Sequence, residues 1–151
     1  MKTFFTIAVI LSMLASDRLF ASTYGIPTRL TDTQLDLIKK NVLVNLENSA
    51  VEVRADAIQL LIDLRKNFPN ADLDFAILPL LNRLKSDDRE EIRILSAIAL
   101  YNFDSELGRF AVERRALYDS SQRVSKQCLN IAHVWNHSTT MPAATAALTE
   151  N

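Results

Sequence analysis

The stretch DDREEIRILSAIALYNF, residues 87–103, repeats the hydrophobic pattern of NSAVEVRADAIQLLIDL, residues 48–64, at a distance of 39 positions. Apolar or small residues recur in both stretches at spacings of three and four, which places them on one side of a helix. Each stretch therefore predicts a helix that buries one face. The matched positions are Val53-Arg54 with Ile92-Arg93, Ala57 with Ser96, Leu60-Leu61 with Ala99-Leu100, and Leu64 with Phe103.

Both helices are expected to start with a capping box, in which a short polar side chain and a glutamate three residues later satisfy each other's backbone N–H groups. These boxes would be Ser49–Glu52 and Asp88–Glu91. Before each box, residues 35–46 and 73–84 carry the apolar pattern of another helix, so the repeated unit is a helix pair. The first helices are expected to be capped by Thr31 with Gln34, and by Asn70 after Pro69.

A third, looser copy follows at an offset of 32 positions. Its turn is DSSQ, residues 119–122, and Arg123 stands where the capping glutamate should be. A degenerate copy is typical of a terminal unit, because one of its flanks has no neighbour. Its first helix would use Leu107, Phe110-Ala111 and Leu117, and its second would use Val124, Cys128, Ile131-Ala132 and Trp135.

The second unit, ILPLLNRLKSDDREEIRILSAIAL at residues 77–100, closely resembles a HEAT repeat. It has a Leu-Pro-Leu-Leu opening, an aspartate-bearing turn, and an apolar residue followed by arginine. A period of 39 is in the length class of HEAT and armadillo repeats. The resemblance covers about residues 31–136 and implies an all-α fold, a short α-α superhelix of three helix pairs. The units would be residues 31–68, 70–103 and 104–137.

The resemblance also implies a structural role for the repeated arginines. In HEAT-like units this arginine commonly binds the acidic turn of a neighbouring unit, so Asp87 is the expected partner of Arg54, and Arg93 has the same role one unit later. The alternative is that Arg54 and Arg93 bind a ligand.

The termini carry patterns of their own. Lys2 followed by an apolar run at residues 4–14 and a small residue, Ala21, is typical of a secretory signal peptide over residues 1–21. A buried first helix and an uncleaved anchor are the alternatives. Residues 22–30 would be a linker and residues 138–151 a flexible tail. The protein would then be exported, periplasmic or secreted, with no membrane insertion after removal of the signal.

The composition excludes several classes of function. Seventeen basic and 18 acidic residues leave no positive field for nucleic acid. The single cysteine, Cys128, cannot form an internal disulfide or a cysteine metal cluster, and we expect it to be inert in a small core position. His133 and His137 lie one turn apart, but no third ligand is close in sequence, so we expect no metal site. No catalytic motif is visible, and no cofactor is expected.

A partner would bind the second helices, which usually line the concave side of HEAT-like folds. Leu95 and Ile98 stand out in this surface, since the corresponding residues of the first unit are Asp56 and Gln59. They would form a docking site for a peptide or partner helix, unless neighbouring helices or residues 141–148 cover them. The expected surface consists of Glu52, Asp56, Gln59, Asp63, Glu91, Leu95, Ile98, Asn102, Arg123, Gln127 and Asn130.

Together these features predict an exported, non-catalytic scaffold that binds a protein or peptide. The alternative is a lyase-like HEAT enzyme or enzyme subunit, a class that shares only generic repeat residues with this chain. Terminal repeats that lack a fully polar outer face could also pair with another copy.

Overall fold

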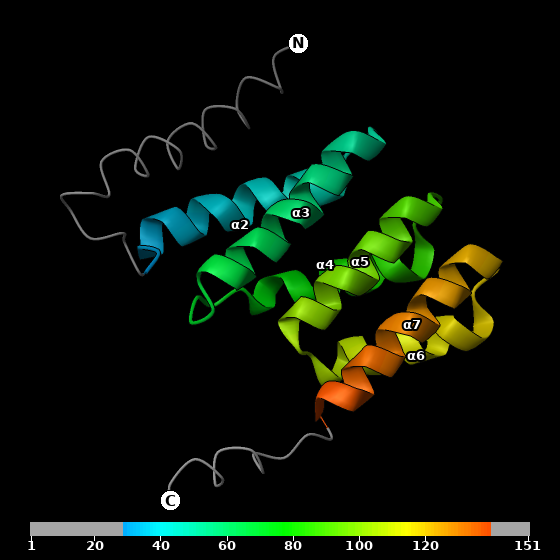
Figure 1. Ribbon diagram of the computed structural model, residues 1–151. Coiled ribbons are helices and arrows are strands. Elements are labelled where there is room, and N and C mark those ends of the chain that lie inside the picture. Colours follow the sequence, from blue (N-terminus) through cyan, green and yellow to red (C-terminus); the bar gives the residue numbers. More distant parts are fainter. Residues whose placement is uncertain (1–28, 140–151) are drawn as a thin grey trace, which may run out of the picture. The chain divides into compact units, whose positions relative to one another are not determined.

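The computed structural model of the chain describes residues 29–139, which form six α-helices, one 3-10 helix and no strand (Figure 1). The fold class is therefore all-α, as predicted. The predicted signal peptide, the linker up to residue 28 and the tail from residue 140 lie outside the described residues. The elements are α2 (Asp32–Leu46), α3 (Val51–Asn67), η1 (Asp74–Ala76), α4 (Ile77–Ser86), α5 (Glu90–Phe103), α6 (Glu106–Tyr118) and α7 (Gln122–Thr139).

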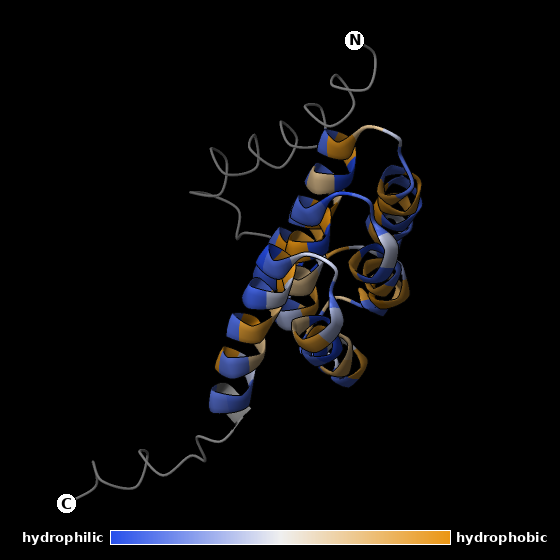
Figure 2. Ribbon diagram, turned by 90° about the vertical axis from the view of Figure 1, so that its right-hand side faces the viewer, coloured by the Kyte–Doolittle hydropathy of each residue, from blue (hydrophilic) through white to orange (hydrophobic). Residues whose placement is uncertain are grey.

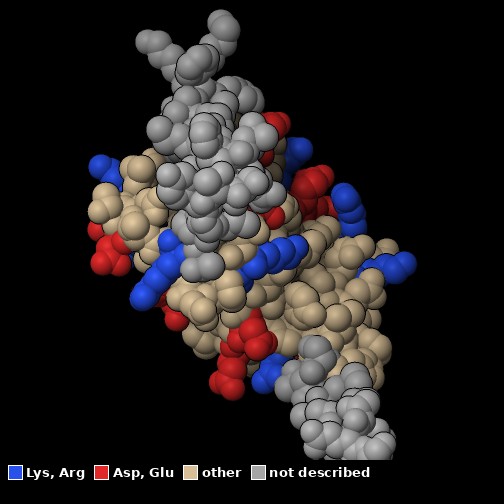
Figure 3. All heavy atoms as spheres, turned by 60° about the vertical axis from the view of Figure 1, so that its left-hand side comes forward, with Lys and Arg blue, Asp and Glu red and all other residues tan. Residues whose placement is uncertain are grey.

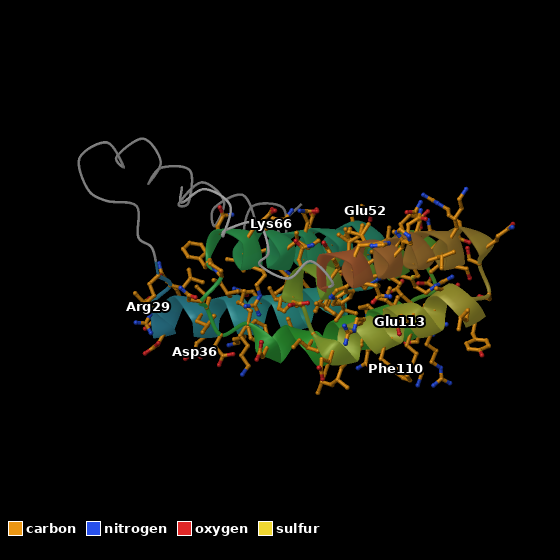
Figure 4. All side chains as sticks on the ribbon, turned by 60° about the horizontal axis from the view of Figure 1, so that its bottom comes forward. Arg29, Asp36, Glu52, Lys66, Phe110 and Glu113 are labelled. Atoms are coloured by element: carbon orange, nitrogen blue, oxygen red, sulfur yellow. The ribbon has the colours of Figure 1, made fainter. Side chains whose placement is uncertain are left out.

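The helices are packed in two layers within one compact unit that begins at Thr31. We call α2, α4 and α6 the A layer, and α3, α5 and α7 the B layer. Each A-layer helix packs on the B-layer helix that follows it, and α5 packs between α3 and α7 (Figures 1 and 4). Within the described residues, no helix has the length and apolar character needed to cross a membrane.

Most of the predicted apolar stripe of the B layer is core, and its members Val53, Leu60 and Ile131 are half-buried. Ala57, Leu61, Ile92, Leu100 and Trp135 are all buried. A second set of buried residues, Ile58, Ile62 and Ala97, was not distinguished by the repeat pattern. Each B-layer helix is thus buried on more than one side, against its own partner and against a neighbouring pair. Figure 2 shows the two layers coloured by hydropathy.

The capping boxes predicted for α3 and α5 are wrong, because both helices begin one residue later, with caps at Ala50 and Arg89 whose own side chains accept no hydrogen bond from the first turn of the helix. The side chains two residues before each cap act instead. Asn48 Oδ1 accepts from the backbone N–H of Ala50 at 2.9 Å, and Asp87 Oδ1 accepts from that of Arg89 at 3.1 Å. These Asx turns fix the direction of the chain just before each helix.

The two predicted caps of the A layer have opposite outcomes. The capping box of Thr31 and Gln34 is confirmed, with the Gln34 N–H donating to Thr31 Oγ1 and the Thr31 N–H to Gln34 Oε1. The cap at Asn70 is wrong, since α4 begins only at Ile77, after the 3-10 turn η1. Leu73, buried just before that turn, anchors the intervening segment in the core.

The predicted buried face of α6 is also wrong. Leu107, Phe110 and Leu117 are 62%, 65% and 71% exposed, whereas Gly108 and Val112 are buried. The physical reason is a close helix approach: a Cβ atom on Gly108 would lie only 3.0 Å from Leu100 Cβ. The helix α6 turns its smallest residue toward α5. The larger apolar residues of α6 therefore point outward.

Candidate functional site

A repeated arginine–aspartate arrangement positions the B layer. Arg54 Nη2 lies 3.0 Å from Asp87 Oδ1, which confirms the pairing expected from the sequence. Arg93 Nη2 lies 3.0 Å from Asp119 Oδ1, one helix pair further along. All four side chains are largely or fully buried, so these are structural contacts between neighbouring pairs, and neither arginine is free to hold a ligand.

Each buried aspartate also receives an arginine from the A layer. Arg83 reaches Asp87 and Arg115 reaches Asp119, both at 3.4 Å and both four residues earlier in the chain. The repeat pattern in the sequence did not identify Asp119, Arg83 or Arg115 as members of this arrangement. A signal was present, because the Arg83–Asp87 spacing recurs 32 positions later, the offset already found for the third copy.

The electrostatic setting of Asp87 keeps its carboxyl group ionised. Burial by itself would raise the pKa of Asp87, but the hydrogen bond from the backbone N–H of Arg89 and the guanidinium of Arg54 together hold that pKa below its usual value. The charged pair is thus part of the folded state under ordinary conditions, and it fixes the turn before α5 against α3.

The predicted partner-binding residues lie on the B layer, on the sides of the helices that the core leaves open. Figure 4 shows Glu52 on α3 at this surface, opposite to Phe110 on α6. Leu95 and Asn102 are half-buried, and the other predicted residues are exposed: Glu52, Asp56, Gln59, Asp63, Glu91, Ile98, Arg123, Gln127 and Asn130. We call these eleven residues the B surface.

Contacts within the B surface order part of it. Arg123 Nη1 on α7 lies 3.7 Å from Glu91 Oε1 on α5, which links the two helices. On α3, Gln59 donates to Asp63 Oδ1 at 3.1 Å. The α3 part of the surface carries three carboxylates, on Glu52, Asp56 and Asp63, and the α7 part carries Arg123, so its charge changes along the layer.

The apolar centre of the B surface is partly accessible. Ile98 is 36% exposed and Leu95 is half-buried. Neighbouring helices therefore cover Leu95 in part and leave a substantial fraction of Ile98 open. Glu91 lies one helical turn before Leu95 on α5. Figure 3 shows one face of the molecule, on which acidic and basic side chains are interspersed.

Two residues considered for chemistry are also placed. His133 and His137 are exposed on α7 with their Nε2 atoms 3.2 Å apart, and no group of three potential metal ligands forms among residues 29–139. Cys128 is fully buried, and this burial, with the negative charge of Asp119, raises the pKa of its thiol to about 11. A thiol in this setting stays protonated at neutral pH and is a poor nucleophile.

A second exposed feature, which the sequence pattern did not predict, lies on the A layer. Large apolar side chains on α2, α4 and α6 are more than half exposed, namely Leu37, Val44, Leu78, Leu107, Phe110, Leu117 and Tyr118. Apolar periodicity alone could not separate these residues from core positions.

Comparison of the whole chain with known protein families, curated proteins and solved structures finds no match.

Proposed function

We propose that the chain is a HEAT-like α-solenoid that binds a protein or peptide partner through the B surface, without catalysis or a cofactor. In this proposal the three helix pairs act as repeats and the protein is exported. The repeated arginine–aspartate contacts support the repeat assignment, because Asp87 and Asp119 join equivalent elements in successive pairs.

The observation that carries the binding role is the accessibility of Ile98 on a helix face that also carries Glu91. An apolar side chain that remains 36% exposed, two helical turns after Glu91 on α5, can contribute to binding without rearrangement of the core. The carboxylates of Glu52, Asp56 and Asp63 continue this surface along α3. A fitting partner is an extended or helical peptide with an apolar anchor followed by basic residues, since charge complementarity fixes its direction.

Selection from a random peptide library against the immobilised full chain tests this proposal. The selected peptides are expected to share an apolar residue with lysine or arginine beside it. The double variant Glu91→Arg/Ile98→Asp should weaken their binding at least tenfold, because it reverses one charge and removes the apolar contact.

Leu78→Asp is the matched control, since Leu78 is an exposed apolar residue of the A layer. It should leave peptide affinity unchanged. The B surface would be the wrong site if Leu78→Asp and the double variant weakened binding equally. The binding role itself would fail if no peptide were enriched above an unrelated helical protein.

A further inference from the structure

The outward face of α6 is an apolar stripe that the rest of residues 29–139 leaves exposed. Its exposed residues are Glu106, Leu107, Phe110, Arg114, Leu117 and Tyr118, and the four apolar or aromatic members are 62% to 73% exposed. Spacings of three and four residues place them on one side of the helix. Figure 4 shows Phe110 directed away from the B layer.

The order of residue types along this stripe is nearly the same when it is followed from either end of the helix. Leu107 lies five residues before position 112, and Leu117 lies five residues after it, with Tyr118 beside it. Phe110 and Arg114 lie two residues before and after the same position. In an antiparallel pair of α6 helices centred there, Leu107 is level with Leu117 and Tyr118 of the other copy, and Phe110 is level with Arg114.

We propose that α6 is a self-association surface through which two copies of the chain form an antiparallel, two-fold symmetric pair. A two-fold interface requires a surface complementary to itself, and the α6 stripe meets this requirement. Leucine and tyrosine side chains at each end exclude water, while the arginine of one copy stacks on the phenylalanine of the other, a favourable cation–π contact.

The charges and the surroundings of the stripe agree with pairing. Each face carries one acid, Glu106, and one base, Arg114, so two faces meet without net repulsion. Leu78 on α4, 66% exposed, corresponds to Phe110 at the offset of 32 and extends the apolar surface onto the neighbouring A-layer helix. We expect the contact between two α6 helices to bury less than the about 800 Å² per partner of a standard interface, so the dimer should be weak and concentration-dependent.

Sedimentation velocity of the full chain over a range of concentrations measures this association. The average mass should rise toward that of a dimer with increasing concentration. Phe110→Ser should raise the dissociation constant at least tenfold, whereas Leu129→Ser should leave it unchanged, because Leu129 is 58% exposed on α7 and lies outside the stripe. Both residues are exposed, so circular dichroism melting should show both variants folded.

Engineered cysteines test the antiparallel register. An oxidised equimolar mixture of Leu107→Cys and Tyr118→Cys should form a cross-linked heterodimer. Either variant alone should cross-link much less, because two copies of residue 107 would lie about 15 Å apart along the helix axes. The buried Cys128 does not compete.

The proposal is overturned if the wild type stays monomeric at every concentration, or if Phe110→Ser and Leu129→Ser weaken association equally. Equal cross-linking by the single variants and by their mixture would likewise exclude the antiparallel pair.

Discussion

One position repeats across the three helix pairs with a different small residue each time. Ala57, Ser96 and Cys128 are all buried at matched sites on the B-layer helices. The Ser96 hydroxyl makes no hydrogen bond within the described residues, although it is fully buried. An unsatisfied buried hydroxyl is costly, because it loses its hydrogen bonds to water on folding. Ser96 is therefore a local weakness in the middle pair.

Replacing Ser96 by alanine should raise the free energy of unfolding by about 1 kcal/mol, because it removes an unsatisfied polar group at little cost in volume. Urea denaturation followed by circular dichroism measures the change. The converse substitution, Ala57→Ser, should lower the free energy by a similar amount and serves as the matched control. A loss of stability in both variants would show that the Ser96 hydroxyl has a favourable role.

At the scale of elements, one buried carboxylate joins three parts of the chain. Asp87 accepts from Arg54 on α3, from Arg83 on α4 and from the backbone N–H of Arg89 just before α5. Asp119 repeats this arrangement with Arg93, Arg115 and the N–H of Ser121. Each turn between the layers is thus fixed both to its own pair and to the preceding one, which sets the spacing of the B-layer helices.

Asp87→Asn should lower the free energy of unfolding by about 3 kcal/mol at neutral pH, because it removes the buried carboxylate of Arg54 and leaves only the exposed Asp88 as its charged partner. The folded pKa of Asp87 is lowered, so its stabilisation is complete above the unfolded pKa of about 3.9 and is lost as the pH falls through the folded value. The difference between wild type and variant should be constant from about pH 5 to pH 8 and shrink below about pH 4.

Asp88→Asn is the internal control for this ion pair. Asp88 lies 3.2 Å from the same arginine, but its side chain is 83% exposed, so its removal should cost less than about 1 kcal/mol. Denaturant titrations of both variants across this pH range separate the two contributions. Equal losses in the two variants would mean that burial of Asp87 adds nothing to the strength of the contact.

Across the whole molecule, the sequence predicted those features that a linear period encodes. The repeat of Arg54 as Arg93 located the helix pairs, and the small residues Ala57 and Ser96 located the core. The orientation of α6 could not be predicted, because it depends on the approach of Gly108 to Leu100. The partly exposed state of Ile98 and the contact of Glu91 with Arg123 depend likewise on how α5 packs against α7.

The two exposed faces lie on different layers, so the proposed activities should be separable. Phe110→Ser should weaken pairing at α6 at least tenfold and leave peptide affinity unchanged, while Glu91→Arg/Ile98→Asp should weaken peptide binding and leave pairing unchanged. Sedimentation and peptide binding, measured on both variants, test this directly. The physical reason is that substitutions at distant sites without shared contacts change the free energies of binding and association independently. A loss of peptide binding in Phe110→Ser would instead show that the partner recognises the paired form of the protein, so that the B surfaces of both copies act together.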